Sequence, residues 1–408
     1  MKSKALLAAV LLITVSPLPA AETPGSFHFD FTGRKVLKDL TATISPTNVF
    51  TRATGCGYDL GTAPTSTGPC FFSVTVPEGN HRVFITFGNQ DSATTNTIKA
   101  EARRLMVEQV VTQPGEIVGR AFNVHTRTVK ISDAEHVKLK AREKTNEVIT
   151  WDDKLTLEFN GACPGVRALE ITPAPTNVTT VFIAGDSTVC DQPLEPWNSW
   201  GQMLPRFFSD QVSVANYAES GESIKSSLGA NRFKKIYATI RPGDYLFVQF
   251  GHNDMKDKAT NALVVYKTNL KKIVADTRAH GATPVLVTSM ERKAGVEHDT
   301  LAGYPGVVRE VAKEDGVALI DLHATSRIFY QALGAELGQA FQDGTHHNNY
   351  GSYELARCVI EGIRANQLPL AKFLAGDAQP FAPAKPDDVK IFRMAESPLR
   401  DTHKPDGS

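Results

Sequence analysis

After residue 180, short apolar runs alternate with amphipathic segments of helical length, and this alternation limits the fold more than any other feature of the chain. It is typical of βαβ units and of a parallel sheet with helices on both faces. We therefore expect a doubly wound α/β domain. Its strands are predicted at 181–184, 212–216, 245–249, 284–288 and 318–321, and its helices near 199–208, 225–237, 261–280, 304–313, 326–337 and 352–366.

The preceding part of the chain, from residue 26 to about residue 173, has a different pattern. Its runs are shorter, and turn-forming sequences such as Pro77-Glu-Gly-Asn80 separate them, which predicts an all-β sandwich. Its strands are expected at 27–31, 71–76, 81–87, 109–111, 117–124, 155–159 and 168–171. The segment 96–106 fits either a helix or a pair of strands.

Two proline-containing segments set the expected domain boundaries. Residues 172–177 predict a linker, so the sandwich is expected over 22–174 and the α/β domain over 175–375. The remaining tail, 376–408, is polar and rich in proline. We expect it either to be disordered or to fold back along the surface.

The first 21 residues predict a secretory signal peptide. Basic residues at 1–4 precede an apolar stretch, 5–15, and a small-residue cleavage region, 16–21. The apolar stretch is shorter than the roughly 20 residues that a membrane span needs. We therefore expect a secreted or periplasmic protein with no membrane partner.

Charge and cysteine content exclude some partners and leave other questions open. The chain has 44 basic and 44 acidic residues and no dense basic run, so nucleic acid is not an expected partner. Cys56 and Cys70 flank a loop that a disulfide could close, and the odd count of five leaves at least one free thiol among Cys163, Cys190 and Cys358. No metal-ligand spacing is present, so no metal is expected. The oligomeric state stays open.

Candidate catalytic residues follow the predicted strands. Ser187 ends the sequence Gly185-Asp-Ser187 after the first strand of the α/β domain, Gly221 follows the second, and Asn253 follows the third. Carboxyl ends of parallel strands meet at one edge of a sheet, where ligands bind. Near the end of the domain, Asp343 and His346 are three residues apart.

These residue types together predict acyl transfer without a cofactor. Ser187 would attack a carbonyl, His346 would act as general base and then general acid, and Asp343 would orient the imidazole. The N–H groups of Ser187 and Gly221 and the Asn253 amide would stabilise the oxyanion. Taken singly, Ser187 also fits a helix cap and Gly221 a turn.

Several neighbouring residues have competing interpretations. His347 is expected to pack or to line the cleft rather than to act as the base. His252 fits a structural hydrogen bond as well as a substrate contact, and Asp186 is expected to organise its loop. Trp197 and Trp200 fit either stacking on a sugar ring or burial in the core.

The ordered set Ser187, Gly221, Asn253 and His346 resembles the four blocks of the SGNH (GDSL) hydrolase superfamily. The resemblance covers about 181–366 and implies a flavodoxin-like sheet. A narrower resemblance is to the rhamnogalacturonan acetylesterases. It rests on Gly185-Asp-Ser-Thr188, Trp197-Asn-Ser-Trp-Gly201, Asn216-Tyr-Ala218 with Gly221-Glu-Ser223, Phe250-Gly-His-Asn-Asp254 and Asp343-Gly-Thr-His346.

The narrower resemblance implies a carbohydrate esterase that removes O-acetyl groups from pectin. It also implies a galactose-binding-like sandwich before the hydrolase domain and substrate contacts by Arg292, Trp197 and His252. The Met290-Glu291 pair before Arg292 departs from the family pattern, which leaves the detail of the substrate open.

The most favoured function is therefore a secreted serine esterase acting on acetylated polysaccharide or oligosaccharide, with acetylated rhamnogalacturonan first. Alternatives are another SGNH esterase, namely an acetyl-xylan esterase, a lipase or lysophospholipase, or a thioesterase. An alternative of a different class is a carbohydrate-binding protein whose hydrolase domain has lost activity. Against it argues the presence of all five candidate residues, Ser187, Gly221, Asn253, Asp343 and His346. The sandwich either binds carbohydrate, through aromatics such as Phe50 or Tyr58, or only shapes the cleft.

Overall fold

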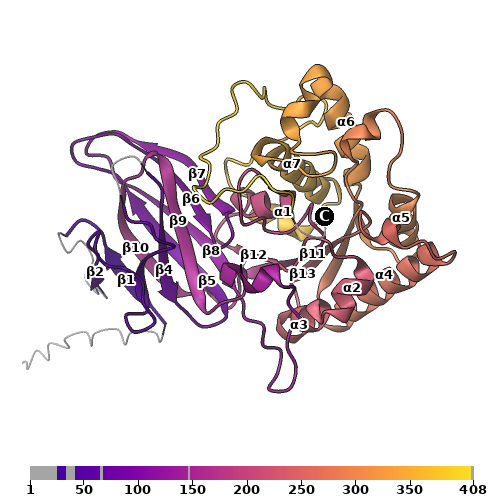
Figure 1. Cartoon of the computed structure of the whole chain (residues 1–408), viewed down its shortest axis with the longest axis horizontal. Helices are drawn as coiled ribbons and strands as arrows, with labels where there is room; N and C mark the ends of the chain where they lie inside the picture. Colours follow the sequence, from indigo (N-terminus) through magenta and orange to yellow (C-terminus); the bar gives the residue numbers. More distant parts are fainter. Residues whose placement is uncertain (1–24, 34–41, 65–67, 146–147, 406–408) are drawn as a thin grey trace, which may run out of the picture.

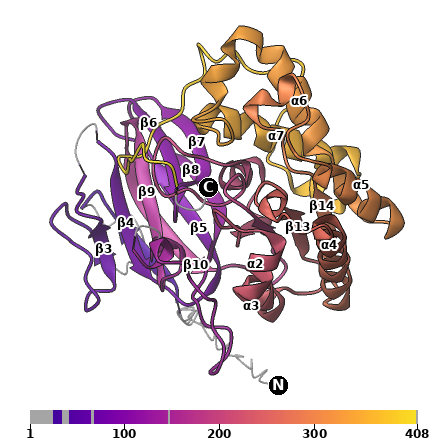
Figure 2. The ribbon, with the colours of Figure 1, turned by 45° about the vertical axis from the view of Figure 1, so that its right-hand side comes forward.

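The computed structural model describes residues 25–33, 42–64, 68–145 and 148–405, so the expected signal peptide lies outside the described residues. Three five-stranded sheets make up the β structure. Two lie face to face at one end of the molecule, and the third, with helices on both faces, forms the other end (Figures 1 and 2). No helix in the described part of the chain has the length and apolarity that crossing a membrane requires.

The amino-terminal half is the expected sandwich. One sheet has the order β2-β1-β10-β5-β8 and the other β3-β4-β9-β6-β7. Their strands are β1 (Phe27–Asp30), β2 (Ala42–Thr43), β3 (Cys56–Asp59), β4 (Cys70–Thr75), β5 (Gly79–Phe87), β6 (Thr94–Ala100), β7 (Arg104–Thr112), β8 (Val118–Thr126), β9 (Lys154–Cys163) and β10 (Val166–Pro173). The segment 96–106 belongs to the strand pair β6–β7, not to a helix.

Alternation of side chains builds the sandwich core. In β5, every second residue from His81 to Phe87 is buried, as expected for a strand with one face on the core. Phe72 and Phe159 stack between the sheets, and Tyr58 is buried beside Phe72. Tyr58 therefore belongs to the core and is not the exposed aromatic that we expected.

The second half contains the parallel sheet. Its order is β12-β11-β13-β14-β15, which is the flavodoxin-like order 2-1-3-4-5. The strands are β11 (Thr179–Gly185), β12 (Val212–Asn216), β13 (Tyr245–Gln249), β14 (Thr283–Val287) and β15 (Ala318–Ile320). All five predicted strands are confirmed within one or two residues at each end. The strand order reverses at β11, so the binding crevice is expected at its carboxyl end.

Helices cover both faces of this sheet because successive strand residues alternate between two cores. Val181 and Ile183 face the cluster formed with α1, α6 and α7, whereas Phe182 and Ala184 face the cluster formed with α3, α4 and α5. The helices are α1 (Trp200–Met203), α2 (Ile224–Gly229), α3 (Arg232–Thr239), α4 (Ala262–Ala279), α5 (Tyr304–Glu314), α6 (Leu322–Leu333) and α7 (Asn349–Ala365). Short 3-10 turns lie at Arg142–Lys144, Val148–Thr150, Leu204–Phe207, Asp254–Lys256, Lys293–Val296, Gly334–Ala340 and Pro369–Phe373.

Two helices are shorter than predicted for local reasons. The segment predicted as one helix at 225–237 is broken into α2 and α3 because Asn231 takes a left-handed conformation, with φ +64°. The segment 199–208 begins as α1 and tightens to a 3-10 turn at Leu204–Phe207, where Pro205 has no N–H to continue the helix.

The disulfide considered between Cys56 and Cys70 is absent, and all five cysteines are free thiols. Cys56 lies opposite Val74 across the β3–β4 pair, and Cys70 is four residues further along β4. Four residues of strand span roughly 13 Å, which is about twice the Cα separation that a disulfide can bridge. The expectation of this disulfide was therefore wrong.

Of the two expectations for the tail, the structure shows the folded-back path. The tail, yellow in Figure 1, leaves α7, reaches the sandwich and returns toward the centre of the molecule. Tyr350 Oη donates to the Asp387 carbonyl oxygen at 2.7 Å, and Asn160 of β9 donates to the Glu396 carbonyl oxygen at 2.7 Å. The tail therefore contacts both halves of the chain.

Candidate active site

Ser187 lies two residues beyond β11, the strand at which the sheet order reverses. Asp186 shapes this turn, since its Oδ1 accepts hydrogen bonds from the Thr188 N–H at 3.0 Å and from the Thr188 hydroxyl at 2.7 Å. Burial would raise the pKa of Asp186, but His252 and these donors outweigh it and lower the pKa. A side chain at Gly185 would lie 2.8 Å from the Gln249 carbonyl oxygen, so the approach of β13 requires glycine there. Asp186 organises the loop, as expected.

Ser187, His346 and Asp343 form a continuous hydrogen-bonded line. Ser187 Oγ lies 2.9 Å from His346 Nε2, and His346 Nδ1 lies 2.8 Å from Asp343 Oδ2. Burial would raise the pKa of Asp343, but the hydrogen bonds from the His346 ring and backbone lower it well below the ordinary range. Asp343 is therefore an ionised acceptor, and the Nδ1 proton of His346 points at it. That tautomer leaves Nε2 free to take the serine proton.

Three candidate N–H donors come from the loops that follow the neighbouring strands β11, β12 and β13, namely the N–H groups of Ser187 and Gly221 and the Asn253 amide. The structure gives no hydrogen-bond partner among the described residues to the N–H of Ser187 or to that of Gly221. Gly221 has φ +73°, a conformation that favours glycine. Asn253 uses one amide hydrogen for the Glu222 carbonyl oxygen at 3.0 Å, which leaves its second hydrogen available. Two residues with free backbone donors and one side-chain amide are thus available for an anion.

Of the two roles that fit His252, a substrate contact and a structural hydrogen bond, its position supports the structural one. It is 3% exposed, and both ring nitrogens have partners, Asp186 Oδ2 at 3.4 Å and the Met290 carbonyl oxygen at 3.1 Å. Beside it, Asp254 accepts from the Ile224 N–H at 3.0 Å. Burial and the nearby Asp186 charge raise the pKa of Asp254 to about 7.

Trp197 is buried against the imidazole of His346. The rings of Trp197 and His346 meet edge to face, with centroids 5.7 Å apart. Trp197 is 5% exposed, and its Nε1 donates to the Asp401 carbonyl oxygen of the tail at 3.0 Å. Of the two alternatives, stacking on a sugar ring and burial, the structure shows burial, in which the Trp197 ring supports that of His346. Trp200 is fully buried and bonds Gln249 Oε1 at 2.8 Å.

His347 is not positioned to act as the base. Its Nε2 lies 2.8 Å from the Tyr330 hydroxyl, and its ring lies 4.2 Å, centroid to centroid, from that of Phe341. Burial, with the charge of His346, lowers the pKa of His347 to about 3. It is a neutral packing residue, as expected.

Arg292 lies next to His252 at the edge of the site. Its guanidinium donates to the Thr300 carbonyl oxygen at 3.1 Å and to the His252 carbonyl oxygen at 3.4 Å. It has no carboxylate partner among the described residues. The unexpected Glu291 before it is buried and accepts from the Thr300 N–H at 3.2 Å. Glu291 thus anchors the loop that follows Arg292.

Glu291 also belongs to a group of three side chains that could hold a cation. Atoms of Glu291, Asp299 and His323 lie within 4.8 Å of one another. Arg309 donates to His323 Nδ1 at 3.1 Å, so Nε2 carries the ring proton and donates to Glu291 at 3.2 Å. The two buried members of the group, Glu291 and His323, are therefore hydrogen-bonded to each other.

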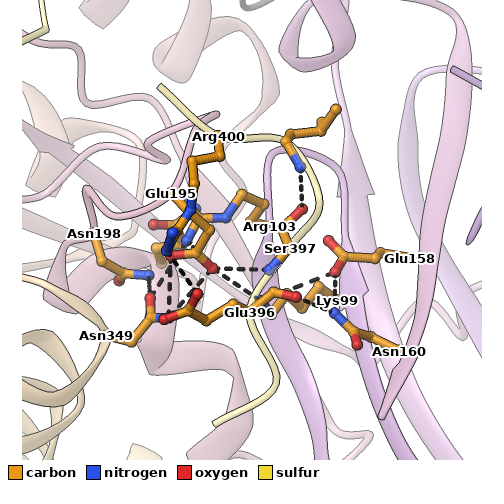
Figure 3. A network of polar contacts seen from close by, with 12 residues as sticks. Lys99, Arg103, Glu158, Asn160, Glu195, Asn198, Asn349, Glu396, Ser397 and Arg400 are labelled. Carbon is orange, nitrogen blue, oxygen red and sulfur yellow. Dashed lines mark hydrogen bonds and ion pairs between the residues drawn. The ribbon is translucent and has the colours of Figure 1, made fainter. Parts of the chain in front are cut away.

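A buried seam, which the sequence did not reveal, supports the loop that carries Trp197 (Figure 3). Its centre is Glu195, which pairs with Arg103 at 2.6 Å and with Lys99 at 3.4 Å, both from the sandwich. Its Oε1 also accepts from the Ser397 N–H of the tail at 3.0 Å. Burial would raise the pKa of Glu195, but the two cations lower it. Sandwich, hydrolase domain and tail therefore meet two residues from Trp197.

Comparison with known proteins agrees with this geometry. Residues 183–352 match the model of the GDSL-like Lipase/Acylhydrolase family. Rhamnogalacturonan acetylesterase RhgT of Bacillus subtilis is 37% identical over 217 residues, which are 48% of this chain and 93% of the relative. The probable rhamnogalacturonan acetylesterase YesY of the same organism is 33% identical over 207 residues, 47% of this chain and 95% of the relative.

A solved structure, that of the protein YxiM from Bacillus subtilis, aligns with 84% of this chain and 99% of its own, with 21% identity and a TM-score of 0.48. The relatives that are at least 33% identical match over almost their entire length. The chain therefore belongs to the GDSL-like lipase/acylhydrolase family and is related to its rhamnogalacturonan acetylesterases.

Proposed function

We propose that this protein is a secreted serine esterase that removes O-acetyl groups from plant cell-wall polysaccharide. Its preferred substrate in this proposal is acetylated rhamnogalacturonan. The observation that carries the proposal is the hydrogen-bonded line Ser187–His346–Asp343. The N–H groups of Ser187 and Gly221 have no hydrogen-bond partner in the part of the chain that the structure describes. The relationship to proteins named rhamnogalacturonan acetylesterases supports the choice of polysaccharide.

The proposed reaction has two steps. Ser187 Oγ attacks the acetyl carbonyl carbon while His346 Nε2 takes the hydroxyl proton, and the N–H groups of Ser187 and Gly221 with the Asn253 amide stabilise the oxyanion. The intermediate collapses when His346 returns the proton to the departing sugar oxygen, leaving acetyl-Ser187. A water molecule then attacks the carbonyl carbon of this ester while His346 takes its proton. The bond from this carbon to Ser187 Oγ breaks as His346 returns the proton to Oγ, and acetic acid leaves and ionises to acetate. Each oxyanion donor contributes about 3 kcal/mol to lowering the barrier.

The positive charge of Arg292, Lys256 and Lys404 supports the choice of an acidic polysaccharide as substrate. Arg292 and Lys256 have no carboxylate partner among the described residues, and Lys404 Nζ lies 3.9 Å from Asp343 Oδ2. Burial lowers the pKa of Lys256, and the charges of Lys404 and Arg292 lower it further, so Lys256 is repelled by both of these cations. A substrate with carboxylates would relieve this repulsion.

The test is acetate release by the purified protein from acetylated rhamnogalacturonan, with acetylated xylan and a long-chain p-nitrophenyl ester in parallel. We expect the highest rate with rhamnogalacturonan and no turnover by Ser187→Ala, with an unchanged circular dichroism spectrum. Preference for xylan would retain the mechanism and change the substrate. Preference for the long acyl ester would favour a lipase, and wild-type activity in Ser187→Ala would refute the mechanism.

A further inference from the structure

The described part of the connection between β8 and β9, residues 127–145 and 148–153, leaves the sandwich and packs on the hydrolase domain. Its hairpin lies beside α3 (Figure 1), where the Asn231 side chain donates to the His136 carbonyl oxygen at 3.1 Å. Further along, the Lys138 N–H donates to the Ala230 carbonyl oxygen at 3.0 Å, and Trp151 is buried in the core shared with Phe182. The connection is therefore fixed to the hydrolase domain.

Two cations of this connection bind one carbonyl in the active-site loop after β12. Lys140 Nζ donates to the Ser220 carbonyl oxygen at 2.6 Å, and an Arg142 guanidinium nitrogen donates to the same oxygen at 3.2 Å. Hydrogen bonds from charged donors are roughly twice as strong as neutral ones. They occupy the two lone pairs of this carbonyl.

The Ser220 carbonyl and the Gly221 N–H belong to one peptide unit. In a planar trans peptide these groups point in opposite directions, so donors that hold the oxygen on one side fix the direction of the N–H on the other. Gly221, with φ +73°, has the backbone freedom that would let an unheld peptide rotate. Charged donors on the oxygen also polarise the peptide and strengthen its N–H as a donor.

Both cations are themselves held in place. Lys140 Nζ also pairs with Glu222 Oε1 at 3.0 Å, and Arg142 pairs with the buried Glu219. Glu143, the residue after Arg142, accepts from the Lys140 N–H at 2.8 Å and from Arg232 at 2.7 Å. The carbonyl therefore faces donors that are already positioned.

We propose that Lys140 and Arg142 are positioning residues that orient the Gly221 N–H toward the oxyanion, and that the sandwich thereby helps to form the active site of the hydrolase domain. The inference rests on the proposed function, because it assigns a role within the same reaction. The role that it assigns to the sandwich is to increase the rate of hydrolysis, not to bind carbohydrate.

The test uses p-nitrophenyl acetate, which requires no polysaccharide. Lys140→Met keeps the apolar stem of the side chain and removes its donor. Arg142→Lys removes the guanidinium but keeps a cation beside Glu219. A double variant carries both substitutions. Loss of one oxyanion donor costs about 100- to 1,000-fold in kcat. A misoriented donor should cost less, so we expect the double variant to lose at least tenfold in kcat with KM changed less than threefold. Lys140→Arg should recover most of the rate.

Two measurements separate positioning from a general loss of structure. The inhibition constant of methylboronic acid, whose serine adduct mimics the tetrahedral intermediate, should rise in parallel with the loss of kcat. Lys138→Met, an exposed neighbour on the same segment, is the matched control and should leave both values unchanged. Thermal unfolding of each variant is recorded alongside.

The outcomes distinguish this inference from the proposed function. If wild type hydrolyses the ester, Ser187→Ala does not, and the double variant retains wild-type kcat and boronate affinity, the positioning role is refuted and the esterase stands. If wild type itself neither hydrolyses the ester nor binds the boronate, the proposed function and this inference are both refuted.

Discussion

At the residue scale, the hydrogen bonds of Asp343 determine which tautomer His346 takes. Asp343 Oδ1 accepts from the Thr345 and His346 N–H groups, each at 2.6 Å, so only Oδ2 is left for the imidazole. Each oxygen thus has a separate task. One shapes the turn that presents His346, and the other holds its Nδ1 proton.

This division predicts that Asp343→Asn is more damaging than Asp343→Ala. In the asparagine variant the amide oxygen is held by the two backbone donors, so the NH₂ group faces His346 Nδ1 and favours the tautomer with a proton on Nε2. A tautomer of this kind costs about 10⁴-fold in kcat in the trypsin triad. We expect a loss of about 10³- to 10⁴-fold here for asparagine and a smaller one for alanine, measured as kcat on p-nitrophenyl acetate. Equal losses would contradict the tautomer argument.

Asp254 gives a prediction about the pH dependence of stability. Its pKa is raised to about 7 in the folded protein, against about 3.9 in an unfolded chain. Between these values the folded state holds a proton that the unfolded state has lost, so the free energy of unfolding falls as pH rises. Between pH 5 and pH 7, the free energy of unfolding of wild type should therefore fall by up to about 3 kcal/mol more than that of Asp254→Asn, which has no carboxyl group to ionise.

Urea unfolding of both proteins at pH 5, 6, 7 and 8 measures this difference. The difference in stability should grow up to about pH 7 and then level off, whatever its absolute size. Asp254 Oδ2 has no hydrogen-bond partner among the described residues, so the amide replaces no bond of that atom. A pH-independent difference would mean that Asp254 is ionised throughout.

At the element scale, local sequence predicted the strands and the residues at their ends. Ser187, Gly221 and Asn253 each follow an apolar run, and parallel strands bring such positions to one edge. The supports of these residues were not predictable. Lys140 and Ser220 are 80 positions apart, and nothing local to Lys140 marks its target. The tail was ambiguous for the same reason, since its path depends on contacts such as Asn160 with the Glu396 carbonyl oxygen.

The tail should therefore affect catalysis through Trp197. A chain ending at Ser397 lacks the Asp401 carbonyl that accepts from Trp197 Nε1 and the Leu399 carbonyl that accepts from the Glu195 N–H at 2.8 Å. A buried donor left unpaired costs about 1–3 kcal/mol, so we expect Trp197 to become mobile and kcat to fall about tenfold. Tryptophan fluorescence should shift to longer wavelength.

The control for this truncation is a chain ending at Lys404, which keeps every tail contact described above and should behave as wild type. Trp197→Phe separates the two effects, because it keeps a ring against His346 but loses the bond to the tail. A fully active chain ending at Ser397 would show that the tail does not support the imidazole.

At the scale of the whole molecule, the two halves share buried charge and cannot be independent. Arg104 of β7 pairs with Asp191 of the hydrolase domain at 2.6 Å, and Arg103 pairs with Glu195 at 2.6 Å. All four side chains are at most 2% exposed. Separating the halves would leave these charges unpaired. We therefore expect the sandwich and the hydrolase domain to unfold in one transition, with circular dichroism and tryptophan fluorescence changing together.

Glu195→Gln tests this coupling directly. The amide keeps the shape of the carboxylate but leaves Arg103 and Lys99 facing a neutral group, and breaking a buried ion pair costs about 3–5 kcal/mol. The matched control is Glu396→Gln, which removes the partner of Arg400 in a pair whose side chains are 50% and 58% exposed and should cost less than about 1 kcal/mol. If Glu195→Gln is as stable as the control in urea, the seam does not stabilise the assembly. If it is destabilised and the two probes also separate, then Glu195 is the residue that makes the two halves unfold together.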